Sequence, residues 1–238
     1  MMRRTNTNPV VRAALWLLTA SISLTSHGQG LNNLWMGGYD GSFGPPFGGI
    51  DLSFDGGELS ITQVSRAIGF KRTCANITDD SGNLSFSTNG SFVANATGDT
   101  MANGSGLSPS TYTSTYPGGL FISQAALILP YPEHDGQFFL FHSTIDNDQT
   151  LTASYVYLSL IDMSLDGGFG GVVFKNQPVV TDDLNAGKIT AVKHANGRDW
   201  WVFCHKANST TYYRLLVDPQ GVSEPLTQDI GTIRPPDL

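Results

Sequence analysis

A short unit of two strand-like runs around a glycine turn recurs three times along the chain, and it constrains the fold more than any other feature. The turn glycines are Gly82, Gly136 and Gly197, which lie 54 and 61 residues apart. The turns and the runs after them are Asp80-Ser81-Gly82-Asn83 before Leu84–Thr88, His134-Asp135-Gly136-Gln137 before Phe138–His142, and Ala195-Asn196-Gly197-Arg198 before Trp200–His205. One such unit cannot bury both of its faces alone, so the repeat predicts an array of packed sheets.

This spacing is typical of a four-stranded propeller blade with a long loop. We therefore predict an all-β fold of β-propeller blades, each with four antiparallel strands. Ile161-Asp162 and Val217-Asp218 stand at equivalent positions of two units, 56 residues apart, which supports the register. The blade units are expected near residues 74–120, 121–180 and 188–232.

Three units do not close a propeller ring, because propellers have about four to eight blades. Residues 31–70 are expected to supply an irregular fourth blade, and residues 29–238 then form an incomplete propeller of about three to four blades. The alternative is an open fragment, which would expose sheet edges and apolar blade faces. Such surfaces favour partner strands or self-association.

The composition favours strands over helices. Charged residues make up only 14% of the chain, which holds 27 Gly and 12 Pro, and no segment after residue 30 has a sustained helical apolar period. Asn95–Thr115 is predicted to be a long polar loop. Ile233–Leu238 shows no strand pattern that could complete a further blade.

The first 28 residues have the pattern of a secretory signal peptide. Three arginines (Arg3, Arg4 and Arg12) precede the uncharged apolar run Ala13–Leu24, and small residues at Ser26 and Gly28 predict cleavage between Gly28 and Gln29. The alternative is a short membrane anchor, but a dozen apolar residues fall short of the roughly 20 that span a bilayer. We expect a secreted or cell-surface protein without a membrane span.

The charge balance excludes some partners. The net charge is −7, and removing three of the 13 basic residues with the signal peptide would leave ten against 20 acidic residues. A negative surface repels phosphate backbones and anionic membranes. Nucleic acid is therefore not an expected partner.

The chain has two cysteines, Cys74 and Cys204. An exported protein could pair them, but they lie in the first and third units, which need not touch. Cys204 also lies within an apolar run, where a buried free thiol acts as a small hydrophobic group. The sequence leaves the disulfide open and offers no metal-binding Cys-x-x-Cys spacing.

One loop has a ligand set that suits Ca²⁺. Asp146-Asn147-Asp148 places two carboxylates and an amide oxygen together, and hard oxygen ligands are what Ca²⁺ prefers. The glycine and the terminal Glu of an EF-hand are missing, so an exposed hairpin loop is the alternative. Asp79–Asn83 similarly resembles an Asx turn more than a metal site. No other cofactor is expected.

The hairpin of the third unit carries a second candidate ligand site. Lys193, His194, His205 and Lys206 bracket it, and the two histidines could approach one another to bind a metal or an anion. The alternative is one surface or hydrogen-bonded histidine per hairpin.

Catalysis has little support in the sequence. A propeller glycosidase needs two opposed carboxylates, and Asp162 and Asp218 each end a strand before a turn, where Asp is expected for structural reasons. No hydrolase, zinc-protease or P-loop motif occurs.

Six Asn-x-Ser/Thr sequons are attributed to the polar composition rather than to glycans. They are at Asn76, Asn83, Asn89, Asn95, Asn103 and Asn208.

Several stretches together resemble the N-terminal propeller region of large secreted Bacteroidetes proteins that often end in a type IX secretion sorting domain. They are Leu34–Gly37, Cys74–Leu84, Met101–Leu107, Gln124–Pro130, Ile161–Gly168 and, most specifically, Thr190–Val202. The resemblance implies a WD40-like or Kelch-like propeller, export, and a binding or adhesive role. Compared with that pattern the chain stops early, so it is expected to be a truncated product or a fragment of a larger protein.

The sequence thus predicts a secreted β-propeller binding or scaffold module without evident catalytic activity. Its ligand, a protein or a glycan, is expected on the loops at 95–115 and 143–151, because loops carry most binding functions. The alternatives are an extracellular propeller-type glycan hydrolase and a non-functional truncated gene product.

Overall fold

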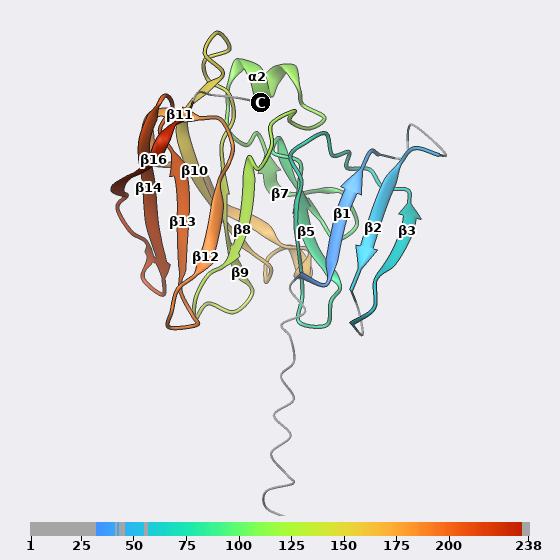
Figure 1. Cartoon of the computed structure of the whole chain (residues 1–238). Coiled ribbons are helices and arrows are strands. Elements are labelled where there is room, and N and C mark those ends of the chain that lie inside the picture. The colour runs from blue at the N-terminus through green and yellow to red at the C-terminus, as the bar shows by residue number, and fades with distance from the viewer. Residues whose placement is uncertain (1–31, 41, 43–45, 55–56, 235–238) are drawn as a thin grey trace, which may run out of the picture.

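The structure is a computed structural model that describes residues 32–40, 42, 46–54 and 57–234 (Figure 1). The predicted signal peptide and its Gly28–Gln29 cleavage site lie outside these residues. The all-β prediction is confirmed: the described residues form strands, with one five-residue helix, α2 (Thr111–Thr115), and short 3-10 turns. In the described part of the chain, every helix is too short or too polar to cross a membrane.

The strands form three sheets. The N-terminal sheet has the order β1-β2-β3, the central sheet β4-β5-β6-β7-β11-β10-β9-β8, and in the C-terminal sheet β12-β13-β14 is extended at the β14 edge by β15 and β16. The bounds are β1 Leu34–Gly38, β2 Gly49–Ser53, β3 Ser60–Val64, β4 Ala75–Thr78, β5 Leu84–Thr88, β6 Phe92–Asn95, β7 Thr100–Ser105, β8 Ala126–Pro130, β9 Gln137–His142, β10 Thr152–Asp162, β11 Gly171–Asn185, β12 Thr190–Lys193, β13 Trp200–His205, β14 Ser209–Asp218, β15 Gly221–Val222 and β16 Leu226–Arg234.

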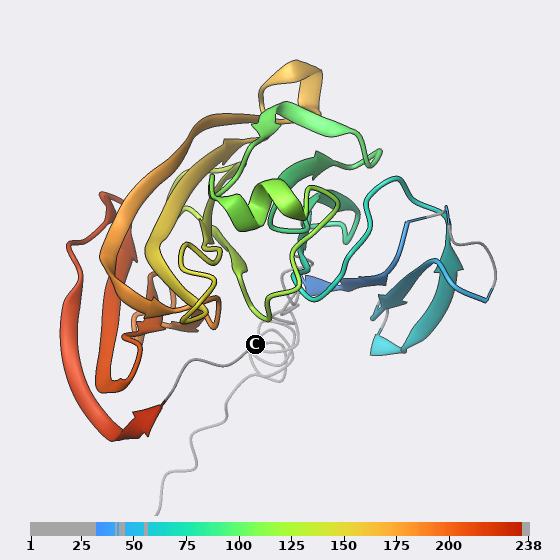
Figure 2. The ribbon, with the colours of Figure 1, turned by 90° about the horizontal axis from the view of Figure 1, so that it is seen from above.

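The central sheet consists of two antiparallel meanders. Strands β4–β7 form the first unit and β8–β11 the second, and the one parallel pairing between them is Gly171 opposite Ala102. Lys175 strengthens this junction, because its Nζ donates to the carbonyl oxygens of Asn103 (3.0 Å) and Ser105 (2.7 Å). Strands β12–β16 form the third unit. Seen from above, the N-terminal sheet and the three units follow one another along an arc (Figure 2).

The three predicted hairpins are present. Each glycine turn joins two antiparallel strands, namely β4–β5, β8–β9 and β12–β13. Gly82, Gly136 and Gly197 have φ of +83°, +73° and +75°, in the left-handed region where a side chain would be strained. The strand that ends at Asp162 and the one that ends at Asp218 are both the third of their unit, as predicted.

One prediction was wrong. Asn95–Thr115 is not one loop, because it contains β7 and α2. Met101 is the one buried apolar side chain of β7, so the strand lacks an apolar pattern. Gly104 lies so close to β6 that a Cβ on it would be 2.8 Å from the carbonyl oxygen of Val93. Ile233 lies within β16, which pairs with β14 and so belongs to the third unit, whereas residues 235–238 lie outside the described part of the chain.

The run Phe138-Phe139-Leu140-Phe141 is apolar throughout because both faces of the second unit are covered. Phe138 and Leu140 pack with Phe86 of the first unit in one buried cluster. Phe139 and Phe141 pack with Val202, Leu215 and other residues of the third unit in another cluster. Successive strand residues point to opposite faces, so a strand between two packed sheets loses its polar alternation.

A buried histidine ends the second strand of both the second and the third unit, and each one contacts the unit before it. The Ser108 Oγ, which follows β7, lies 2.6 Å from His142 Nδ1. Asn185 at the end of β11 donates its Nδ2 to His205 Nδ1 at 2.9 Å. These two contacts are equivalent joints between consecutive units.

Candidate functional site

The three hairpin turns of the repeat meet at one edge of the molecule and line a pocket of about 580 Å³. This edge is the lower one in Figure 1, opposite α2. The first turn contributes Asp80, the second contributes Pro130–Phe138, and the third contributes Lys193, Gly197, Arg198 and Trp200. We call it the turn pocket.

The turn of the second unit is held in shape by its own backbone. Tyr131 N donates to Gln137 O at 3.0 Å and Gln137 N donates to His134 O at 3.1 Å. The Tyr131 and His134 rings stack with their centroids 3.8 Å apart and their planes 20° apart. The wall of the pocket that these residues form is therefore pre-organised.

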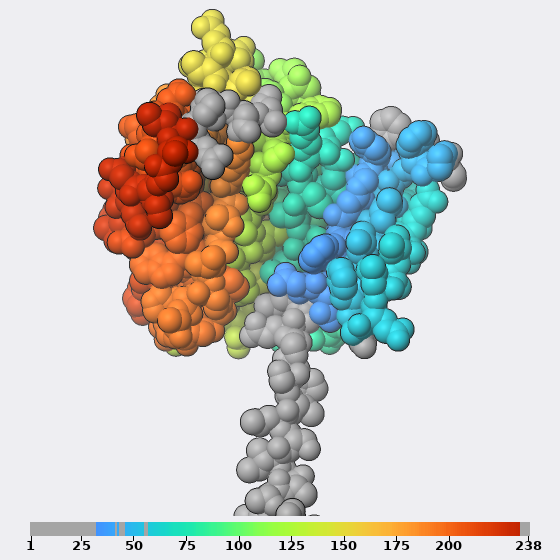
Figure 3. All heavy atoms as spheres, viewed as in Figure 1, coloured from blue at the N-terminus to red at the C-terminus, as the bar shows by residue number. Residues whose placement is uncertain are grey.

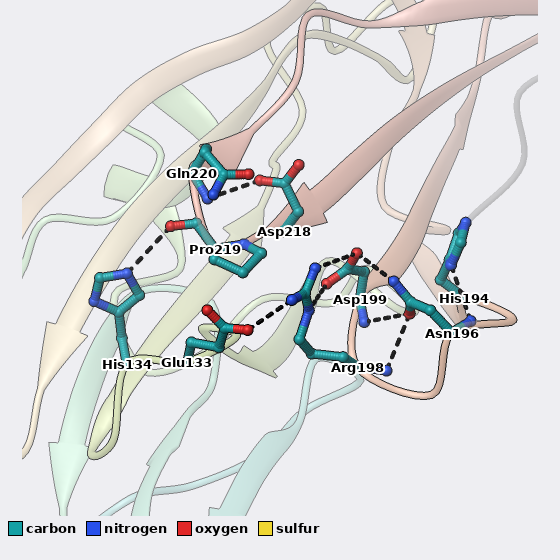
Figure 4. A network of polar contacts seen from close by, with 9 residues as sticks. All are labelled: Glu133, His134, His194, Asn196, Arg198, Asp199, Asp218, Pro219 and Gln220. Atoms are coloured by element: carbon teal, nitrogen blue, oxygen red, sulfur yellow. Dashed lines mark hydrogen bonds and ion pairs between the residues drawn. The ribbon is translucent and has the colours of Figure 1, made fainter.

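Arg198 ties the turn of the third unit to that of the second (Figure 4). Its Nη1 lies 2.6 Å from Glu133 Oε1, and its Nε lies 2.7 Å from Asp199 Oδ1. Hydrogen bonds from Arg198 and Asn196 lower the pKa of Asp199. The charge of Arg198 is thus compensated by two carboxylates.

A second contact holds the same two units together beside the pocket (Figure 4). His134 Nε2 lies 3.2 Å from the carbonyl oxygen of Pro219, and the Tyr131 hydroxyl lies 3.4 Å from the same oxygen. Pro219 is fixed in turn, because Asp218 Oδ1 accepts from Gln220 N at 2.8 Å. The turn after β14 therefore stabilises the turn after β8 through these contacts.

Lys193 is the predicted ligand residue that does line the pocket. Its Nζ lies 3.9 Å from the centroid of the Trp200 ring, a cation–π geometry. Partial desolvation lowers the pKa of Lys193. With the described residues its ammonium forms no ion pair, in contrast to Arg198. Lys193 is therefore the cation of the pocket that can take up an acceptor from a ligand.

The two histidines of this hairpin do not approach one another, contrary to the hypothesis that they share a ligand. Lys193 pairs with Trp200, so His194 sits at the turn, whereas His205 lies at the far end of β13 opposite Tyr212. Five residues of strand separate His205 from Trp200, which is about 16 Å at 3.3 Å per residue. His205 is buried against the second unit. Lys206 likewise turns to the second unit, where its Nζ lies 2.7 Å from Asp182 Oδ2.

The acidic loop at 146–148 lies at the opposite edge, and its polar groups serve the loop itself. Asp146 Oδ2 accepts from Ser154 N at 2.7 Å, and Asn147 Oδ1 accepts from Gln149 N at 3.1 Å. Desolvation raises the pKa of Asp146. Asp148 is exposed beside them. Within the described residues, no three or more His, Cys, Asp or Glu side chains gather as a metal site would require.

Asp162 and Asp218 each cap the turn after a long strand. Asp162 Oδ1 accepts from Ser164 N at 2.8 Å, which matches the Asp218 contact with Gln220. Asp79 Oδ1 accepts from Ser81 N and Asn83 N, both at 2.9 Å, and so forms the predicted Asx turn. The carboxylates that could have formed a catalytic pair thus bind backbone amides of their own turns.

Both cysteines are free thiols. Cys204 is buried, and desolvation raises its pKa to about 12. The Cys74 thiol donates to the Met36 carbonyl oxygen at 2.9 Å. The two residues belong to the first and third units, as the sequence indicated.

Three of the six sequon asparagines bond to segments distant in the sequence, a structural role that the sequence did not reveal. The amide nitrogen of Asn76 donates to Leu34 O at 2.8 Å, that of Asn89 to Gly69 O at 3.2 Å, and that of Asn103 to Val172 O at 2.8 Å. A glycan would attach to this same nitrogen. These side chains therefore connect neighbouring segments.

The loops first expected to bind the ligand lie elsewhere. The 143–151 segment and α2 stand at the upper edge in Figure 1, and a smaller pocket of about 350 Å³ lies beside α2 and β7. The turn-pocket residues Tyr131, Glu133, Arg198 and Trp200 were missed as a group. The signal that could have found them is the repeat, because equivalent turns of successive units fall at the same edge of the array.

Comparison of the chain with protein-family models, with curated proteins and with solved structures finds no match.

Proposed function

We propose that this protein is an exported binding module of the β-propeller type whose ligand occupies the turn pocket. The observation that carries the proposal is the convergence of three repeated turns on one pocket, in which the Lys193 ammonium lies beside an indole ring and forms no ion pair with the described residues. Ligand sites of repeat arrays commonly lie on the face where equivalent loops gather.

The arrangement of the sheets supports the propeller interpretation. The second and third units each open with a short strand followed by an antiparallel meander, and both faces of the second unit pack against neighbouring sheets. The first strands β1, β4 and β8 lie beside one another in sequence along the arc. Radially packed four-stranded sheets with their first strands innermost define a propeller.

A glycan is the ligand class that the pocket fits best. The Trp200 ring and the polar side chains of Lys193, Asp80 and Asp135 line an open cavity, and an aromatic ring beside polar groups suits hydroxyl-rich rings. Hydrolysis is less well supported, because Arg198 already engages Glu133 and Asp199. A glycosidase needs two carboxyl groups about 5 to 10 Å apart on either side of the scissile bond.

A glycan array probed with the full chain tests this function. We expect the wild-type protein to bind a subset of glycans and Lys193→Ala to weaken that binding by about tenfold, which corresponds to one lost charge-assisted hydrogen bond. Lys71→Ala is the matched control, because Lys71 also lies over a ring (Tyr39, 5.0 Å) but in the N-terminal region. Equal loss in both variants, or no glycan bound by the wild type, would contradict the proposal.

The same glycans distinguish binding from hydrolysis. We expect no new reducing ends after prolonged incubation of a bound oligosaccharide with the protein. Release of reducing ends that Glu133→Gln abolishes would establish the hydrolase instead.

Export is tested separately: the N-terminal residue of the protein recovered from the medium of the producing cell is expected to be Gln29.

A further inference from the structure

The third unit carries apolar side chains on both faces, but the described residues cover one of them only. Val202 and Leu215 are fully buried against the second unit. Trp201 and Phe203 point to the other face and are half-buried, and Val192, which pairs with Trp201, is 52% exposed. Leu226 of β16 is 50% exposed. We call this surface the C-terminal face.

The second unit shows what normally covers such a face. Its strand β9 has the same doubly apolar character, and each of its faces packs on a neighbouring sheet of the array. A run such as Trp200-Trp201-Val202-Phe203 is costly on an open surface, since each large apolar side chain gains about 1.5–3 kcal/mol on full burial. The repeat therefore indicates another sheet of the same kind as the occupant.

The N-terminal sheet presents a matching surface at the other end of the arc. Trp35, Leu52 and Ile61 lie in one row across β1, β2 and β3, and Trp35 is 58% and Ile61 66% exposed. The opposite face of this sheet is the one that packs on the chain, because Met36 contacts the buried cluster of Ile68 and Phe70. We call the exposed row, with Ile50 beside it, the N-terminal face.

We propose that a second copy of the chain covers both faces. The N-terminal face of one copy packs on the C-terminal face of the other, and a two-fold axis repeats the contact, so that two arcs close one ring. The N-terminal sheet and the third unit, which carry the two faces, lie at opposite sides of the molecule in Figure 3, the first in blue to cyan and the second in orange to red. Each contact continues the packing found between the units, and two arcs that each hold the N-terminal sheet and three units give eight such elements, which is within the range of propellers.

The mass of the full chain in solution tests this inference independently of any ligand. Sedimentation velocity is expected to show twice the monomer mass of 25.5 kDa, or twice that of the mature chain after signal cleavage. Val192→Lys and Ile61→Lys each place a charge in one face and are expected to raise the dimer dissociation constant by about tenfold or more. Val173→Lys is the matched control, because Val173 is 50% exposed on β11, away from both faces, and should remain dimeric.

Mixing the two variants reveals the arrangement. In a closed head-to-tail ring, the unchanged N-terminal face of a Val192→Lys copy meets the unchanged C-terminal face of an Ile61→Lys copy. One of the two junctions is then wild type on both sides, so the mixture of the two variants is expected to regain dimer. A wild-type monomer with a cooperative melting transition would overturn the proposal. So would a mass that grows without limit with concentration, or a dimer that only one of the two variants weakens. Circular dichroism spectra that match the wild type confirm that the variants are folded.

Discussion

The two joints between successive units share a buried histidine contact but differ in the groups that accompany it. Between the first and second units, His142 is fully buried and its two nitrogens lie 2.6 Å from Ser108 Oγ and 2.8 Å from Ser159 Oγ. Between the second and third units, Asp182 accepts from Lys206 at 2.7 Å and from the Tyr213 hydroxyl. The first joint therefore depends on a neutral buried network around His142, whereas the second combines the buried Asn185–His205 contact with a partly exposed ion pair.

This difference indicates which joint should respond to acid and which to salt. A neutral network in an apolar cluster is insensitive to salt but fails if its histidine gains a proton. A partly exposed ion pair is screened by salt and contributes little to stability in isolation. The turn pocket lies beside the second joint, because Arg198 and His134 both bridge the second and third units. Its geometry is thus tied to the joint that contains a salt-sensitive ion pair.

The largest expected effect comes from the apolar clusters of the joints. Leu140 and Phe141 are adjacent and fully buried, but they face the first and the third unit respectively. Each residue changed to Ala should lower the free energy of unfolding by about 2–5 kcal/mol. Denaturant unfolding measures the loss, and hydrogen exchange should accelerate in the first unit for Leu140→Ala and in the third for Phe141→Ala. Phe169→Ala, at a 48% exposed site, is the control, and identical exchange maps for both core variants would contradict the assignment of faces.

Acid should weaken the first joint next most strongly. Burial lowers the pKa of His142 to about 3 from its ordinary value of 6.5. The unfolded chain therefore takes up a proton below about pH 6.5 that the folded chain refuses, so stability is fully present above that pH and falls as the pH is lowered toward 3, by at most about 1.4 kcal/mol per pH unit. His142→Gln should be less stable at pH 7.5, and its stability should fall less steeply with acid. His194→Gln, a change at the surface turn, should keep the wild-type slope.

The contrast between the joints also shows how far the sequence could lead. The turn glycines and the strands after them were found because Gly at positive φ and apolar runs are local signals. Strand β7 was missed because its pairing with β6 depends on Gly104 and the backbone rather than on apolar alternation. The pairing of Asp182 with Lys206 spans 24 residues and two units, so no local pattern reveals it. Glu133 and Arg198 of the turn pocket are 65 residues apart, so only the repeat, and no local pattern, could bring them together.

Removing the ion pair of the second joint should have a smaller effect that depends on salt. Asp182→Asn leaves Lys206 without its carboxylate and should cost about 0.5–1 kcal/mol at low ionic strength. At about 1 M NaCl the difference from wild type should shrink, because the Debye length falls to about 3 Å. Asp183→Asn, the exposed neighbour, controls for the change in net charge. A loss from Asp182→Asn that stays constant with salt would show that its hydrogen bonds, and not its charge, hold the joint.

The smallest effect on stability is expected at Arg198, where the consequence falls on the pocket instead. Arg198→Lys keeps the charge but loses the planar guanidinium group, whose separate N–H donors bind Glu133 and Asp199 at the same time. The melting temperature should barely change, whereas hydrogen exchange in the 131–137 turn should accelerate and glycan binding should weaken. Arg72→Lys, at an exposed site outside the pocket, should change neither. If the turn stays protected in Arg198→Lys, the Pro219 contacts of Tyr131 and His134 alone suffice to hold the pocket, and the second joint is stronger than its ion pairs suggest.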